Sequence, residues 1–156
     1  YIINWFARNK NVLKDTDQQV CYTRNEENLH ALAGCQIINT IREELPELFD
    51  DELEDKILKE AGEAFLAESK IIDWMANGIN EKGLSALILK EFVKNRINES
   101  LAMIGFKNVF EVDEEILEET MWFEEELIGN NMTDFFKARP TEYAKKSQHY
   151  DEDDLF

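Results

Sequence analysis

The sequence predicts an all-α protein, and three observations support this class. Apolar residues recur every three or four positions over long stretches, which is the spacing of a helix that buries one side. No stretch alternates apolar and polar residues between turn signals, as a half-buried strand does. The chain contains only two prolines, Pro46 and Pro140, so few positions forbid a helix interior. The expected architecture is therefore a set of packed helices.

The first long helix is expected from near Asp15 to Glu44, because Pro46 prevents its continuation. Residues 1–6 also read like the middle of a helix, and they lack the basic region and cleavage site of a signal peptide. We therefore expect the chain to begin partway through a larger protein. Steps of three and four residues along the long helix define one stripe: Val20, Thr23, Glu27, His30, Gly34, Ile37 and Ile41.

A second helix is expected after Pro46, with a capping box at Asp51-x-x-Glu54 and a stop at Asn77-Gly78. Its inward side is expected to carry the following residues: Leu53, Ile57, Ala61, Ala64, Ile71, Ile72 and Met75.

A third helix is expected from about Leu84 to Ile104, with Gly105 as its C-terminal cap. Its inward side is expected to carry Leu84, Leu87, Ile88, Phe92, Ile97, Leu101 and Ile104. A fourth helix is expected from Asp113 to Ile128, where glutamates form a solvated face to which we assign no functional role.

The acidic composition excludes several classes of function. A formal net charge of −17 argues against binding nucleic acid or an anionic membrane, since both need clusters of Lys and Arg. No apolar run approaches the roughly 18 residues of a membrane span, and no Gly-rich phosphate loop is present.

Cys21 and Cys35 share one expected helix and lie about 21 Å apart by helical rise, too far for a disulfide. We interpret them as reduced packing residues of a cytoplasmic protein.

Glu27 and His30 form a Glu-x-x-His pair on the stripe expected to face the core. Residues three apart on a helix are neighbours, so this carboxylate and imidazole can reach one point in space. Burial of an ionisable pair requires compensation, and inward-facing Glu-x-x-His pairs ligate metal in helical di-iron proteins. The alternatives are a solvated surface pair or a buried ion pair without metal. Glu26 also faces His30, and it is expected to orient the ligands rather than to bind the metal itself.

The segment from Lys145 onward is polar and charged, so we expect it to be disordered when free. Its last residues are Tyr150, Asp151, Glu152, Asp153, Asp154, Leu155 and Phe156. A merely solubilising tail would not need a terminal Leu-Phe. We therefore expect residues 150–156 to dock in the groove of a partner protein.

Three stretches carry a resemblance to one known family. One is the run Asn25-Glu26-Glu27-Asn28-Leu29-His30, and another extends from Glu91-Phe92-Val93 through Arg96 to Ile104-Gly105-Phe106. The most specific is Asp134-Phe135-Phe136-Lys137-Ala138-Arg139-Pro140-Thr141-Glu142-Tyr143. The first stretch resembles the Arg-Asp-Glu-x-x-His ligand motif of one family, and the second resembles the helix and Gly-Phe turn that follow that motif. The third stretch resembles the same family's Asn-Phe-Phe-x-x-Arg-x-x-Glu-Tyr segment. That family is the small, radical-generating subunit of class I ribonucleotide reductase, and nearly the whole chain resembles its C-terminal half.

The resemblance implies a ferritin-like helical bundle that holds two metals, iron or manganese or both, bridged by carboxylates. Glu27 and His30 would be ligands from one helix, and Glu26 would lie on the proton-coupled electron path beside them. Tyr143 would relay the radical to the large catalytic subunit, and residues 150–156 would dock there. The complete small subunit would form a homodimer.

The chain departs from the family pattern in two ways. Asn25 stands where the family usually has Arg, and Glu26 is one methylene longer than the family's Asp, which affects the surroundings of the ligands. The family's other ligands lie on helices upstream of Tyr1, so this chain is expected to hold only part of the site. Residues 1–135 are then the helical part of an incomplete domain, and residues 136–156 are a flexible docking tail.

Two other functions remain open at this point. One is a di-iron oxygenase or acyl desaturase, which shares the fold but has no need for a relay tyrosine or a docking peptide. The other is a helical binding module without metal, in which Glu27 and His30 form only an ion pair.

Overall fold

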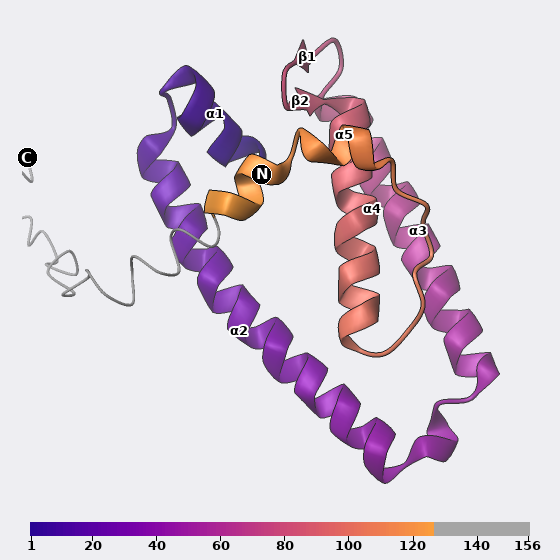
Figure 1. The fold of residues 1–156 in the computed structure, drawn as a ribbon. Helices are drawn as coiled ribbons and strands as arrows, with labels where there is room; N and C mark the ends of the chain where they lie inside the picture. Colours follow the sequence, from indigo (N-terminus) through magenta and orange to yellow (C-terminus); the bar gives the residue numbers. More distant parts are fainter. Residues whose placement is uncertain (127–156) are drawn as a thin grey trace, which may run out of the picture. The chain divides into compact units, whose positions relative to one another are not determined.

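The computed structural model describes residues 1–126 and confirms the all-α class, in agreement with a ferritin-like fold (Figure 1). The chain divides into two units, Tyr1–Phe123 and Glu124–Phe156, and the architecture below is that of the first. Within the described residues, no helix combines the length and the apolar character needed to cross a membrane. The elements in chain order are α1 (Ile2–Lys10), α2 (Lys14–Glu44), the short 3-10 helix η1 (Pro46–Leu48), α3 (Asp51–Met75), β1 (Asn80–Glu81), β2 (Leu84–Ser85), α4 (Ala86–Met103) and α5 (Glu114–Glu118).

The long helix α2 agrees with its predicted bounds to within one residue. It follows a tight turn from α1 in which Asn11 and Leu13 adopt left-handed backbone angles, with φ of 59° and 61°. It ends at Glu44, and Pro46 begins η1, because proline fits the first turn of a helix but not its interior.

The start of α3 differs from the predicted capping box. The cap is Asp50, whose side chain accepts a hydrogen bond of 2.8 Å from the backbone N–H of Leu53. Asp51 is already the first helical residue, so the predicted cap at Asp51 was one residue too late. The helix ends at Met75, and Gly78 follows with a φ of +77°, a conformation that glycine adopts without strain.

A small antiparallel hairpin lies between α3 and α4, and the sequence did not predict it. Asn80 lies opposite Ser85 and Glu81 opposite Leu84, with the turn between them. Strands of two residues are too short to show an alternating pattern. Because β2 includes Leu84, α4 begins at Ala86, where the Ser85 hydroxyl accepts a hydrogen bond of 3.3 Å from the Ile88 N–H.

The helices α3 and α4 pack side by side (Figure 1), and one end of this pair contributes to the main core. That core contains Trp5, Ile72, Ala76, Leu84 and Leu89. The predicted inward side of α3 was partly wrong: Ile72 is buried as predicted, but Ala64, Ile71 and Met75 are exposed, and Ala76 is buried without having been predicted. On α4, Leu87 is also exposed, contrary to expectation.

The tip of the hairpin is held by side chains from two other parts of the chain. Tyr1 donates a hydrogen bond of 2.6 Å to the Gly83 carbonyl, and the Trp5 indole donates one of 3.0 Å to the Lys82 carbonyl. The Gly83 N–H donates to a carboxylate oxygen of Glu119 at 2.9 Å. Burial raises the pKa of the Tyr1 phenol, so this group remains a hydrogen-bond donor.

The predicted helix from Asp113 to Ile128 is interrupted. Asp113 caps α5 through hydrogen bonds to the N–H groups of Glu115 and Ile116. The chain then forms a turn at residues 119–120 before a second helical segment at residues 121–126. The turn allows Thr120 and Phe123 to become buried, which a straight amphipathic helix with this sequence would not predict.

Candidate metal-ligand pair on α2

Glu27 and His30 lie on adjacent turns of α2, as their spacing predicts. The Nδ1 atom of His30 lies 3.4 Å from an Oε atom of Glu27. A carboxylate and an imidazole held this close by a continuous helix offer two ligand atoms to one point in space. The donor types fit a first-row divalent metal, which imidazole and carboxylate ligands both suit.

The pair is exposed in this structure, although it lies on a stripe that was predicted to face the core. The side chains of Glu27 and His30 are 69% and 74% exposed, and Ile37 on the same stripe is also exposed, although Val20 and Gly34 of that stripe are partly buried. The reason is that the described elements pack against a different side of α2. That side carries the partly buried positions Asp17, Cys21, Arg24, Cys35, Ile38 and Arg42, which recur at helical spacing.

Glu26 is exposed as well, and the carboxylate that contacts His30 is that of Glu27. The roles assigned to Glu27 as ligand and to Glu26 beside it both stay predictions. Among residues 1–126, no group of three or more His, Cys, Asp or Glu side chains could hold a metal ion. The described part of the chain therefore offers two ligands and not a closed site.

The helix that carries the pair also presents uncovered apolar side chains. α2 has no fully buried residue, although it is the longest helix. Its exposed large apolar residues are Tyr22, Leu29, Leu32, Ile37 and Ile41. A helix with apolar residues on several sides is characteristic of a central position in a bundle, so this surface is suited to contact further helices.

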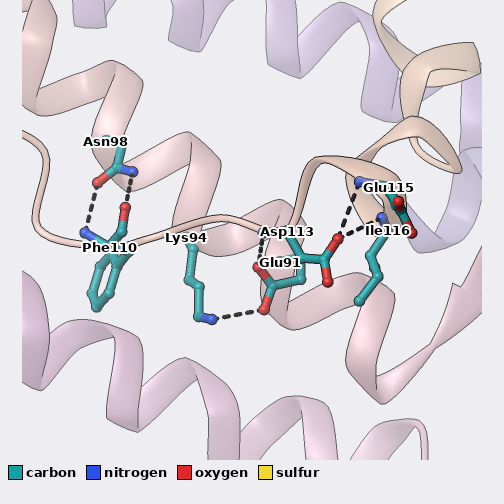
Figure 2. Close-up of polar contacts among 7 residues, drawn as sticks. All are labelled: Glu91, Lys94, Asn98, Phe110, Asp113, Glu115 and Ile116. Atoms are coloured by element: carbon teal, nitrogen blue, oxygen red, sulfur yellow. Dashed lines mark hydrogen bonds and ion pairs between the residues drawn. The ribbon is translucent and has the colours of Figure 1, made fainter.

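A second polar cluster lies on α4, and sequence reasoning missed it (Figure 2). The buried carboxylate of Glu91 contacts the ammonium group of Lys94 at 2.7 Å and accepts a hydrogen bond of 3.0 Å from the Asp113 N–H. One turn further on, Asn98 donates to the Phe110 carbonyl at 2.8 Å and accepts from the N–H groups of Val109 and Phe110.

This α4 cluster serves to hold the chain that follows the helix. Glu91, Lys94 and Asn98 recur at helical spacing, and that periodicity in polar residues is the signal that could have identified them. Their charged and amide groups bond to one another or to the backbone of residues 109–113, so no ligand is required to satisfy them. We regard the cluster as structural.

The remaining predicted site residues lie outside the described residues. They are the proposed relay residue Tyr143 and the proposed docking residues Tyr150, Asp151, Glu152, Asp153, Asp154, Leu155 and Phe156.

Comparison with known proteins yields a family match over most of the chain. A family model described as "Ribonucleotide reductase, small chain" matches residues 1–119. A protein of Aquifex aeolicus (strain VF5) named "Ribonucleoside-diphosphate reductase subunit beta" is 32% identical over 123 residues, which are 78% of this chain and 17% of the relative. A protein of the same name from Chlamydia pneumoniae is 28% identical over 145 residues, which are 91% of this chain and 39% of the relative. The chain thus spans less than two fifths of the length of either relative.

Proposed function

Since the chain belongs to the ribonucleotide reductase small-chain family, we propose that it provides part of a two-metal site and the docking tail of a reductase small subunit. In this role it helps to generate a radical and to pass it to a large catalytic subunit, which reduces ribonucleoside diphosphates. The name shared by both relatives, a ribonucleoside-diphosphate reductase subunit, supports this substrate class.

The observation that carries the proposal is the paired geometry of Glu27 and His30 on an uncovered helix. The Nδ1 atom of His30 and an Oε atom of Glu27 are 3.4 Å apart, and both side chains are exposed. The uncovered apolar residues around them suit contact with the helices that would bring the remaining ligands. In that assembly Glu27 and His30 would each bind metal, and Glu26 would orient the ligands and accept or release a proton beside them.

The bound metals, iron or manganese or both, would supply one-electron oxidation. The contribution of this chain is to hold one carboxylate and one imidazole at a fixed separation on a rigid helix. We propose that the other ligands come from an upstream part of the same subunit, as the resemblance to the family implies.

The partners follow from the same family membership. We propose that residues 150–156 bind the large subunit, with Leu155 and Phe156 as apolar anchors. We propose that Tyr143 carries the radical across the subunit junction, and that the complete small subunit is a homodimer. The family match favours a reductase small subunit over an oxygenase, an acyl desaturase or a metal-free binding module.

Metal binding tests the proposal directly. The chain alone should bind iron or manganese weakly, because two protein ligands leave most coordination positions to water. The chain joined to the upstream part of its subunit should bind two metals per chain, as measured by elemental analysis after gel filtration. Tight stoichiometric binding by the chain alone would contradict the assignment.

Single substitutions in the joined protein identify the ligands. Glu27→Ala and His30→Ala should each lose metal, whereas Glu26→Ala should largely retain it. Glu43→Ala is a matched control, because Glu43 is an exposed glutamate near the end of the same helix. Loss of metal in Glu26→Ala as severe as in Glu27→Ala would mean that the two acids exchange roles.

A further inference from the structure

Cys21 of α2 lies in a polar environment where α1 and α2 pack together. The side-chain amide of Asn4 donates to the sulfur of Cys21 at 3.6 Å, and the guanidinium of Arg24 donates to the same sulfur, also at 3.6 Å. Asn4 is only 3% exposed, so its contacts are made away from solvent. The environment is on the side of α2 that contacts α1, whereas Glu27 and His30 are exposed.

Three buried polar atoms on Asn4, Arg24 and the neighbouring Asp17 have no hydrogen-bond partner among the described residues. They are Oδ1 of Asn4, Oδ1 of Asp17 and Nε of Arg24. Asp17, Cys21 and Arg24 occupy successive turns on one side of α2, so these atoms surround the same stretch of helix. Buried polar atoms are rarely left without partners, because each such atom loses its bonds to water without replacement. The arrangement therefore points to an oxygen-bearing group at this place, one that donates to Asn4 or Asp17 and accepts from Arg24.

We propose that Cys21 is a site of oxidation by hydrogen peroxide and that these orphaned atoms bind the resulting sulfenic acid. The sulfur attacks one peroxide oxygen, an S–O bond forms and the O–O bond breaks. The thiol proton passes to the departing hydroxide, so the thiol and peroxide become a sulfenic acid and water. The sulfur is oxidised and the peroxide is reduced, and no other reagent is consumed.

The sulfenic acid supplies both partners that the orphaned atoms need. Its O–H group can donate to Oδ1 of Asn4, and its oxygen can accept from Nε of Arg24. Cys21 is half-buried, so a molecule as small as hydrogen peroxide can reach it. Arg24 and Asn4 also stabilise negative charge on the sulfur as it attacks, since both direct N–H groups at it.

Cys35 provides a control within the same molecule. It is a free cysteine on the same helix and is also half-buried. Its sulfur has no hydrogen-bond partner among the described residues, so it shares the exposure of Cys21 without the polar environment.

The test is the rate at which each cysteine is captured as a sulfenic acid in the metal-free chain. The protein is treated with hydrogen peroxide in the presence of dimedone, which traps sulfenic acids, and both cysteine peptides are quantified by mass spectrometry. Cys21 should be captured roughly tenfold faster than Cys35, the factor expected of a hydrogen bond to a charged group. Equal capture, or faster capture of Cys35, would overturn the proposal and would indicate that the orphaned atoms bind only water.

Two variants test whether the polar environment is responsible. Arg24→Lys keeps the charge but removes Nε, and Asn4→Ala removes the orphaned oxygen, so each should bring the capture of Cys21 close to that of Cys35. Cys35→Ser should leave the capture of Cys21 unchanged. Circular dichroism establishes whether each variant is folded. The comparison of Cys21 with Cys35 in the unsubstituted chain tests the proposal even if a variant fails to fold. A folded Arg24→Lys protein that keeps the full preference for Cys21 would refute the assigned role of Arg24.

Discussion

Arg42, near the end of α2, donates a hydrogen bond of 2.9 Å to the carbonyl of Gly105, just beyond the end of α4. A second nitrogen of the same guanidinium donates to the Ile104 carbonyl at 2.6 Å. The guanidinium also lies 4.6 Å from the centroid of the Phe49 ring and 4.6 Å from that of Phe106. One side chain therefore satisfies carbonyls at the C-terminal end of α4 and joins that end to α2.

Arg42→Lys should lower the free energy of unfolding by about 2 kcal/mol, because an ammonium group cannot make the paired hydrogen bonds or stack on both rings. Urea denaturation measures the change. Lys59→Ala is the control, since Lys59 forms an exposed ion pair with Glu63 and should cost less than about 0.5 kcal/mol. Equal losses in the two variants would show that the Arg42 contacts contribute nothing specific.

Gly105→Ala should destabilise the protein by about 1–2 kcal/mol, since an L residue is strained at its φ of +77°. An added Cβ would also lie 2.6 Å from Nη1 of Arg42 and would displace the guanidinium. The two variants should therefore be non-additive in a double-mutant cycle followed by thermal unfolding.

Gly62→Ala is the matched control for this substitution. Gly62 lies inside α3, and a Cβ there would meet nothing within 4 Å. It should stabilise the protein by about 0.5–1 kcal/mol, because alanine favours a helix interior. The two Gly→Ala changes are thus expected to have opposite signs, and the same sign for both would contradict the structure at Gly105.

Asn98→Ala should lower the free energy of unfolding by about 2–4 kcal/mol, because it leaves backbone groups of Val109 and Phe110 without partners. The amide protons of these two residues should also exchange faster with deuterium. Asn95→Ala is the control on the same helix, where the amide makes one exposed hydrogen bond to Glu99. If Asn95→Ala proved as costly as Asn98→Ala, the assigned role of Asn98 would be wrong.

A peptide of residues 150–156 should bind the large subunit and compete with the small subunit for it. Its affinity should fall as salt rises but should persist, because screening weakens the acidic contacts and leaves the apolar ones intact. Isothermal titration at several salt concentrations measures this. A shorter peptide without Leu155 and Phe156 should bind far more weakly, and equal competition by that peptide would assign recognition to the acidic residues alone.

Tyr143→Phe separates the formation of a radical from its use. Phenylalanine keeps the ring but has no O–H to lose, so it cannot act as a proton-coupled relay. The variant of the complete subunit should keep full metal content, normal oxidant formation and near-normal binding of the large subunit, yet abolish nucleotide reduction. Turnover close to that of the parent would make Tyr143 a packing residue.

The main helices could be predicted from the sequence because apolar residues recur at helical spacing over long stretches and because proline and glycine mark the helix ends. Pro46 predicted the end of α2 to the residue, and Gly105 predicted the end of α4 to within one residue. The hairpin was missed because its strands are two residues long. The break after α5 was missed because the turn at Glu119 and Thr120 contains neither Gly nor Pro, and tertiary burial of Phe123 overrides helix propensity there.

The candidate site was predictable in its pairing but not in its environment. The spacing of Glu27 and His30 determines that they meet, because helix geometry is local. Their burial depends on which elements cover α2, and the helical stripe alone did not reveal that the described elements cover another side. The polar residues Glu91 and Asn98 were overlooked because amphipathic patterns are read from apolar residues, whereas these two are buried by bonding to backbone.

The way α2 is held has a consequence for assembly. Contacts near its first turns join it to α1, and Asn39 and Arg42 join its last turns to the end of α4. Its middle turns, which carry Glu27 and His30, have no tertiary hydrogen bond within the described residues. Contacts within the described residues therefore hold both ends of α2, while its middle turns remain open to further contacts. A helix that binds to these middle turns would meet an α2 that is already folded and held in position. Its rate of association should therefore be limited by diffusion and not by the folding of α2.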